Sequence, residues 1–257
     1  MRFGNAIKII SVLRKYIKNW LYVSIYIKLN NYPVIIEARN GNVYLARNYD
    51  EFRSIFVKIK YGIEFKFIEK GGDLGETFYF ESYKFSILEN RTVVDVGANI
   101  GDSSIYFAIQ GASRVIAIEP LPQFFNALTD NIKENKLENI IVPLNLMVGN
   151  ENKKTNIDTN IDSGLGTKAE ETLDGFEVNK VTLSYIADKF KIVNGKLKMD
   201  CEGCEYYSII PEKDEILRKF DEMIIEYHNG FQGLKNKLEQ AGFKVSIEKR
   251  IIYAFRT

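Results

Sequence analysis

Apolar and polar positions follow a strand, helix, strand order in the middle of the chain. Residues 92–96 and 114–118 are apolar at most positions, which is typical of buried parallel strands. Between them apolar residues recur at helical spacing, and Asp102, Ser103 and Ser104 offer oxygens that can cap the start of a helix. The pattern predicts two parallel strands joined by a helix.

The same alternation continues to the C-terminus and indicates an α/β domain, which we place at residues 89–257. Further elements are expected as strands at 140–146, 197–200 and 223–227, helices at 121–135, 183–190 and 230–240, and an antiparallel pair at 243–246 and 251–255. The polar stretch 150–180 predicts either a solvated connection or a lid over the site.

The first 88 residues have a different pattern and predict an N-terminal helical and β-rich cap. Asn40-Gly41 between two β-like runs predicts a hairpin within 33–47, and residues 49–61 are expected to form a helix. Residues 64–88 are aromatic and predicted to be rich in strands. Their rings can face a sugar or lipid acceptor, although such rings more often belong to the core.

Apolar residues from 7 to 23 recur at spacings of three and four, which predicts an amphipathic helix. Residues 1–36 carry six basic side chains and no acidic one. Two interpretations stay open: the helix lies on an anionic membrane with Trp20 and Tyr22 at the interface, or it packs its apolar face on the catalytic domain while its lysines stay in water. Its longest uncharged run, 19–27, is too short to span a bilayer, and no signal peptide pattern is present.

Composition narrows the class of protein. The chain has 257 residues, 46% of them hydrophobic, and its 35 basic and 34 acidic residues give a net charge of +1, which does not favour nucleic-acid binding. Its two cysteines, Cys201 and Cys204, form no disulfide framework and predict a cytoplasmic protein. We expect them to act as small apolar residues rather than as a redox pair or zinc ligands.

Glycines and an acid between the two central strands predict a nucleoside site. Gly97 and Gly101 let the backbone pass close to a ligand, and Glu119, 22 residues after Gly97, can accept the hydroxyls of a ribose. Asn99 stands where a dinucleotide fingerprint needs glycine, which disfavours a nicotinamide dehydrogenase. The loop instead suits S-adenosylmethionine, a nucleoside without phosphate.

Four motifs in order strengthen this prediction: Asp95-Val-Gly-Ala-Asn-Ile-Gly101, Glu119-Pro120, Asp200-Cys-Glu-Gly-Cys-Glu205 and Glu226-Tyr-His228. They resemble the FkbM-type methyltransferases over roughly residue 79 to the C-terminus. The resemblance implies a Rossmann-like class I methyltransferase fold with a mostly parallel seven-stranded sheet. It also implies S-adenosylmethionine as the cofactor and a hydroxyl acceptor, such as a sugar in a glycan or glycolipid.

The expected cofactor residues follow the glycine loop and the ends of the next two strands. They are Asp95, Gly97, Ala98, Asn99, Gly101, Asp102, Ser103, Glu119, Pro120, Leu146 and Met147. Met147 stands where the family more often has alanine, so the motif match is weaker at that position.

The expected catalytic residues are Asp200, Glu202, Glu205 and His228, at the ends of the fourth and fifth strands. His228, the chain's one histidine, is either a general base or a hydrogen-bonding partner of a carboxylate. The two glutamates either act in the reaction or only favour a helix N-terminus by their charge. No decisive ligand spacing is present, so we expect no metal. The alternative to an enzyme is a cofactor-binding scaffold docked at a membrane without turnover.

Overall fold

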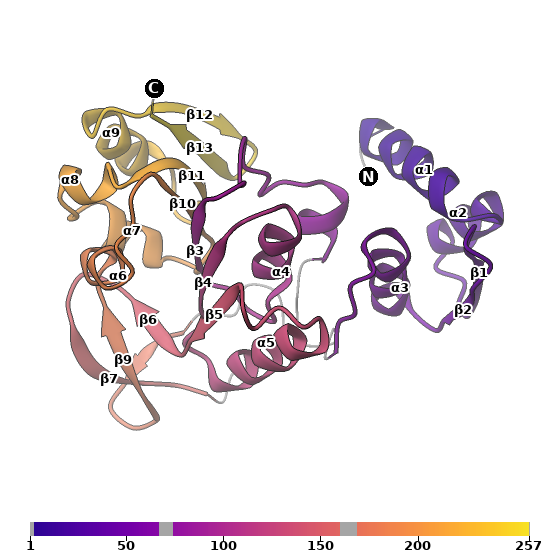
Figure 1. Ribbon diagram of the computed structural model, residues 1–257, viewed down its shortest axis with the longest axis horizontal. Helices are drawn as coiled ribbons and strands as arrows, with labels where there is room; N and C mark the ends of the chain where they lie inside the picture. Colours follow the sequence, from indigo (N-terminus) through magenta and orange to yellow (C-terminus); the bar gives the residue numbers. More distant parts are fainter. Residues whose placement is uncertain (1–2, 67–73, 160–168, 257) are drawn as a thin grey trace.

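The computed structural model describes residues 3–66, 74–159 and 169–256, with side chains from residue 10 onward (Figure 1). A seven-stranded sheet in the order β12-β13-β11-β10-β3-β4-β5 forms its centre. The strands are β3 (Thr92–Val96), β4 (Arg114–Ile118), β5 (Ile141–Leu144), β10 (Gly195–Met199), β11 (Phe220–Glu226), β12 (Lys244–Glu248) and β13 (Ile251–Phe255). The strands from β11 to β5 run parallel, whereas β13 is antiparallel to both of its neighbours. The predicted mostly parallel sheet with a terminal hairpin is confirmed.

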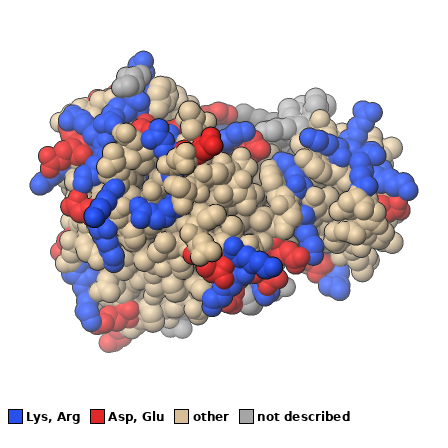
Figure 2. Space-filling model, viewed as in Figure 1, with Lys and Arg blue, Asp and Glu red and all other residues tan. Residues whose placement is uncertain are grey.

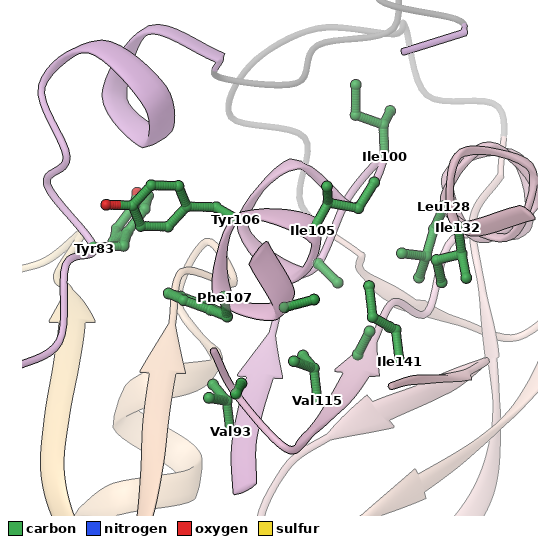
Figure 3. Packing of buried hydrophobic residues seen from close by; sticks show 14 of the residues in the cluster. Tyr83, Val93, Ile100, Ile105, Tyr106, Phe107, Val115, Leu128, Ile132 and Ile141 are labelled. Atoms are coloured by element: carbon green, nitrogen blue, oxygen red, sulfur yellow. The ribbon is translucent and has the colours of Figure 1, made fainter. Parts of the chain in front are cut away.

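Helices cover both faces of this sheet, because its strands carry apolar side chains on both faces. On one face lie α4 (Asp102–Ile109) and α5 (Pro122–Glu134); on the other lie α6 (Leu183–Lys189), α7 (Cys204–Ile209), α8 (Asp214–Leu217) and α9 (Gln232–Gln240). Figure 3 shows Phe107 of α4 over Val93 and Val115 of the strands. The next residue of β3, Val94, belongs to the opposite cluster with Leu238 of α9.

The start of α4 differs from the expectation. Its N-cap residue is Gly101, at φ 92°, and no side chain caps the helix. The hydroxyls of Ser103 and Ser104 instead donate to the buried carboxylate of Asp95, at 2.7 and 2.5 Å. A buried carboxylate without hydrogen-bond donors is costly, whereas a helix end that faces a cavity is not fully buried. This explains why the two hydroxyls bond Asp95 and do not cap the helix.

A second sheet, in the order β6-β9-β7-β8, occupies most of the stretch expected to be a connection or lid. Its strands are β6 (Leu146–Val148), β7 (Lys153–Ile157), β8 (Glu171–Thr172) and β9 (Phe176–Val181). The single strand expected at 140–146 is broken at Asn145, whose amide donates to the carbonyls of Glu119 and Pro120, both at 2.9 Å. Residues 160–168 of that stretch lie outside the described part.

The N-terminal region has its own small core. Its elements are α1 (Phe3–Tyr16), α2 (Trp20–Lys28), β1 (Val34–Glu37), β2 (Val43–Ala46) and α3 (Tyr49–Tyr61). Leu13, Ile17 and Val23 are buried against Phe52 and Phe56 of α3. The amphipathic segment therefore packs its inner face within the N-terminal region, and not on the catalytic domain as one interpretation expected. In the described residues no helix is both long and apolar enough to cross a membrane.

The expected single N-terminal helix is instead two helices separated by residues 17–19. These residues pair with β1: the backbone N–H of Lys18 donates to the carbonyl of Glu37 at 2.7 Å. The side chain of Asn19 exchanges two more hydrogen bonds, both at 3.0 Å, with the backbone of Ile35 and Glu37. Pairing with a strand edge satisfies backbone groups that the helix would otherwise have used.

The strands expected in 64–88 are absent from its described parts, 64–66 and 74–88. A π-helical segment, Gly75–Tyr79, is followed by turns, and the aromatic rings pack on α4. Phe78 lies 5.5 Å from Tyr106, and Phe85 lies 5.3 Å from Phe107, measured between ring centroids. These rings belong to the core, while Tyr83 reaches the functional site described next.

Candidate active site

The site lies where the chain order of the central sheet reverses, between β3 and β10. Open α/β sheets bind ligands at this switch point, outside the carboxyl ends of the strands. Two cavities of about 490 and 540 Å³ meet here, and both are lined by Gly97, Pro120, Ala169 and Cys201. An elongated ligand can therefore extend from one cavity into the other.

The glycine loop that follows β3 lies directly against the backbone that follows β10. Gly97 has φ 76°, and a Cβ added there would lie 1.8 Å from the carbonyl oxygen of Asp200. Asn99 also has a positive φ, 48°, and Gly101 has φ 92°. No residue with a side chain fits at Gly97, so this glycine is required by the approach of the two strands.

Glu119 lies beneath this loop and is 5% exposed. Its carboxylate accepts hydrogen bonds from the backbone N–H groups of Asn99 and Leu121, both at 2.9 Å. Burial raises the pKa of Glu119 to about 7, outweighing the two backbone hydrogen bonds that lower it. Each carboxylate oxygen has a second lone pair, so the acid that lines the cavity can still accept ribose hydroxyls.

We expect Glu119→Ala to weaken S-adenosylmethionine binding about 10- to 100-fold, because a hydrogen bond to a charged group contributes about 1.5–3 kcal/mol. Titration calorimetry measures this. Glu177→Ala, which removes an exposed glutamate of β9, is the matched control and should bind normally. Unchanged affinity in a folded Glu119→Ala protein would contradict the ribose assignment.

Asp95 lies one layer behind the cavities, fully buried and outside both linings. Besides Ser103 and Ser104, it faces the ammonium of Lys198 at 3.3 Å. Lys198 is 2% exposed, lines the 490 Å³ cavity and donates to the carbonyl of Gly97 at 2.9 Å. Burial lowers the pKa of Lys198, but the charges of Asp95 and Asp200 outweigh it and the net pKa is raised.

The sequence interpretation missed Lys198. The available signal was the spacing in Leu197-Lys198-Met199-Asp200, where Lys198 and Asp200 share one face of a buried strand. A charged residue inside such a strand indicates a partner, and here the partners are Asp95 and the glycine loop.

The other expected cofactor residues divide between the two cavities and the protein behind them. Asn99, Asp102, Ser103 and Glu119 line the smaller cavity, Leu146 and Met147 line the larger one, and Gly97 and Pro120 line both. Ala98 is fully buried and Gly101 is absent from both linings. The thioether and leucine side chains give the larger cavity an apolar wall that suits an adenine ring.

Asp200 and Glu226 meet at the carboxyl ends of β10 and β11. The hydroxyl of Tyr83 lies 3.1 Å from Asp200 Oδ2 and 2.9 Å from Glu226 Oε2. Tyr83 has one hydroxyl hydrogen and can donate to only one of the two carboxylates at a time. Burial, followed by the charge of Asp200, raises the pKa of Glu226, while its bond to Tyr83 lowers it by less. The three residues form a coupled acidic group at the cavity wall.

His228 is held between carboxylates. Its Nδ1 lies 2.9 Å from Glu205 Oε1, and its Nε2 lies 3.1 Å from Glu202 Oε2 and 3.7 Å from Asp200 Oδ1. Burial lowers the pKa of His228, but the hydrogen bonds with Glu202 and Glu205 outweigh it and raise the pKa to about 10. At neutral pH the ring is an imidazolium that donates from both nitrogens. Of the two roles considered, these contacts favour the carboxylate partner over the general base.

This charge state predicts a pH dependence of stability. The folded pKa of His228, about 10, exceeds the unfolded value near 6.5, so its stabilisation is complete below pH 6.5 and is lost as pH rises through 10. The contribution is on the order of 3–5 kcal/mol. Urea unfolding at pH 7 and at pH 10 measures the loss of unfolding free energy between the two pH values. We expect this loss to be about 3–5 kcal/mol smaller in His228→Gln than in the unsubstituted protein. Equal losses in the two proteins would contradict the assignment.

Glu205 supports the site from behind. It is fully buried and absent from both cavity linings, and it accepts from the backbone N–H of Gly203 at 2.9 Å. It also receives the backbone N–H of His228 at 3.2 Å. Of the four expected catalytic residues, Asp200, Glu202 and His228 line the cavity, whereas Glu205 fixes the ring of His228.

The expectation about the cysteines is corrected by the structure. Cys201 and Cys204 form a disulfide across the turn that carries Glu202, with their Cα atoms 5.5 Å apart. Glu202 and Gly203 between them both have positive φ, 56° and 117°, and this tight turn brings the two sulfurs together. The sequence placed the two cysteines at a turn from strand to helix but did not predict the bond between them.

Asp200, Glu226 and His228 are also the group, within the described residues, whose donor atoms could hold a metal ion. The three donor atoms lie within 4.8 Å of one another. Both ring nitrogens of His228 already donate to carboxylates, so neither offers a lone pair to a metal ion in this arrangement. The expectation of no metal stays a prediction.

Comparison with known proteins agrees with this geometry. A family model described as the methyltransferase FkbM domain matches residues 95–245. No curated protein matches the chain. Among solved structures, a METTL16 MTase domain is similar with a TM-score of 0.51 and 15% identity, covering 95% of this chain and 89% of its own. A precorrin-6y C5,15-methyltransferase from Geobacter metallireducens GS-15 gives a TM-score of 0.48 at 15% identity, covering 76% and 95%.

The sheet order, the glycine loop and the buried acid after β4 define a class I methyltransferase, which uses S-adenosylmethionine as its methyl donor. The family model spans more than half of the residues. The chain therefore belongs to the FkbM methyltransferase family.

Proposed function

We propose that this protein methylates a hydroxyl oxygen, with a sugar of a glycan or glycolipid as the acceptor. The observation that carries the proposal is the Asp200 and Glu226 pair, bridged by Tyr83 at a cavity that the glycine loop also lines. A hydroxyl is a weak nucleophile, and its attack is helped by a carboxylate within reach of its proton. S-adenosylmethionine supplies an electrophilic methyl group on a positively charged sulfur.

The chain's own residues have separate tasks in this reaction. As the acceptor oxygen bonds to the methyl carbon, the carbon–sulfur bond breaks and the hydroxyl proton passes to the Asp200 and Glu226 pair. Proton uptake suits the pair because the pKa of Glu226 is raised by burial and by the neighbouring negative charge. Glu202, whose pKa is lowered by its hydrogen bond with His228, stays ionised and can accept a second acceptor hydroxyl.

The lining of the smaller cavity supports a polar acceptor. Beyond the acidic pair it contains Glu76, Glu202, Lys249 and Arg250, whose charged groups can exchange hydrogen bonds with several hydroxyls. An acceptor with many hydroxyls, such as a sugar, makes use of more of these groups than a small alcohol does. The resemblance to the FkbM family points to the same substrate class.

Incubation of the purified protein with methyl-tritiated S-adenosylmethionine and a panel of glycans and glycolipids tests the proposal. We expect label in a methyl ether of one acceptor class, identified by mass spectrometry, and incorporation about 10²- to 10⁴-fold slower with Asp200→Asn. Tight cofactor binding without transfer to any hydroxyl acceptor would support the scaffold alternative instead. Transfer to nitrogen or carbon acceptors alone would overturn the assignment of the acceptor atom.

A further inference from the structure

The N-terminal region exposes an apolar surface that its own core does not use. On α2, Val23 is buried and Trp20 is partly buried against the N-terminal core, so the outer side presents other residues. The hairpin has a separate exposed face: Val34 and Ile36 of β1 are buried, and Ile35 between them is exposed. We call the exposed apolar residues of α2 and its C-terminal end the N-terminal surface: Leu21, Tyr22, Ile25 and Leu29.

The α2 part of this surface is a continuous stripe. Leu21, Ile25 and Leu29 recur every four residues, which places them on one side of the helix. Leu21 is 58% exposed and Leu29 is 68% exposed. Contiguous exposed apolar residues of this kind usually mark an interaction site.

Basic side chains are also concentrated in the N-terminal region. Residues 1–47 carry eight basic side chains and one acidic side chain, whereas residues 48–257 carry 27 basic and 33 acidic ones. The N-terminal region is thus strongly positive on a protein whose remainder is negative. Figure 2 shows blue Lys and Arg side chains spread over this end of the molecule, at the right of the view.

We propose that the N-terminal surface docks the protein on an anionic lipid bilayer. Apolar side chains of α2 enter the interface between headgroups and acyl chains, while the surrounding lysines and arginines contact anionic headgroups. Lys18 and Lys28 flank α2 at its two ends, and Lys18 is largely exposed. The structure also revises which residues enter the interface, since Trp20 packs inward and Leu21, Ile25 and Leu29 take its place.

Two other occupants fit the surface less well. A nucleic acid is contacted by basic and aromatic side chains, and the exposed aliphatic residues of α2 add little to such binding. A second copy of the chain would bring two strongly positive surfaces together, which is unfavourable at low salt. An anionic bilayer satisfies both the apolar residues and the charge.

Flotation with vesicles of phosphatidylcholine containing 30% phosphatidylserine tests the proposal with the full chain. We expect the protein to float with these vesicles in 0.1 M NaCl, to bind far less in 0.5 M NaCl, and to bind pure phosphatidylcholine weakly. Failure to float with the anionic vesicles at low salt would overturn the proposal. Binding that is equal for neutral and anionic vesicles would overturn its electrostatic part.

Substitutions separate this surface from general stickiness. Leu21→Ser with Ile25→Ser and Leu29→Ser should abolish flotation, and each of Lys18→Gln and Lys28→Gln should weaken it about five-fold, the change expected for one basic residue near an anionic membrane. The matched control is Leu173→Ser with Val193→Ser, which removes apolar residues that are 95% and 77% exposed elsewhere. Circular dichroism and thermal unfolding verify that all variants fold.

The competing occupants have their own readouts. A dimer by light scattering that dissociates in the α2 triple variant, with no vesicle binding, would overturn the proposal in favour of self-association. Binding to a single-stranded RNA oligonucleotide that is lost in the same variant, again without vesicle binding, would overturn it in favour of a nucleic acid. Vesicle binding that is lost in the α2 triple variant, weakened in the lysine variants and kept in the Leu173→Ser, Val193→Ser control supports it.

Discussion

Asp200→Asn should lower kcat by about 10²- to 10⁴-fold, the range that a general base contributes. Asp200 directly follows β10 at the cavity wall, 3.1 Å from the Tyr83 hydroxyl. An amide there can neither take a proton nor carry the charge that raises the pKa of Glu226. Single-turnover kinetics with the labelled donor and the acceptor found in the screen measure the effect.

Cofactor affinity separates catalysis from binding in this experiment. We expect titration calorimetry to give Asp200→Asn a dissociation constant for S-adenosylmethionine within a few-fold of the unsubstituted protein, since Glu119 and the glycine loop are unchanged. Asp174→Asn, in an exposed turn of the second sheet, is the matched control and should keep full turnover. A kcat within three-fold of normal in Asp200→Asn would remove Asp200 from the reaction.

Gly97→Ala should have the largest effect on folding. The added methyl group would lie 1.8 Å from the carbonyl oxygen of Asp200, and that oxygen belongs to the backbone of the neighbouring strand end. Relief requires separating β3 from β10, so we expect a loss of about 4 kcal/mol or more in unfolding free energy. Urea denaturation gives this value, and an insoluble variant is the extreme form of the same result.

Gly62→Ala is the matched control because it isolates backbone strain from steric conflict. Gly62 has φ 74°, close to the 76° of Gly97, but nothing lies within 4 Å of the added Cβ. We expect a cost of only about 1–2 kcal/mol, the usual cost of a left-handed conformation in a residue with a side chain. If both variants lose the same stability, the close approach of the two strands is not what requires glycine at position 97.

The comparison of prediction and structure is clearest in the central domain. The strands at 92–96 and 114–118 and the helix at 121–135 were predicted to within about one residue, because buried parallel strands are apolar on both faces. The tight turn at Gly97 was predicted for a different reason, while the assignment of Glu119 to the ribose stays a prediction. Close backbone approach permits only glycine, and this requirement is visible in a single sequence.

Other features were predicted poorly because they depend on contacts between distant segments. Tyr83 was interpreted as part of a strand-rich cap, yet its hydroxyl meets Asp200 and Glu226, which lie 117 and 143 residues away. The polar stretch 150–180 contains β7 and β9, which pair with each other, and β9 also pairs with β6 just before the stretch. Apolar and polar residues alternate too weakly in this stretch to predict these strands.

The sequence by itself determined the order of strands and helices, the glycine loop after β3 and the position of the acid that follows β4, since local spacing and backbone sterics depend on neighbouring residues. Only the tertiary structure decided which charges meet. Whether His228 is a neutral base or an imidazolium depends on Glu202 and Glu205 lying around its ring, and on the burial that they overcome. A pKa is set by everything within a few ångströms, and folding brings those groups together from separate parts of the chain.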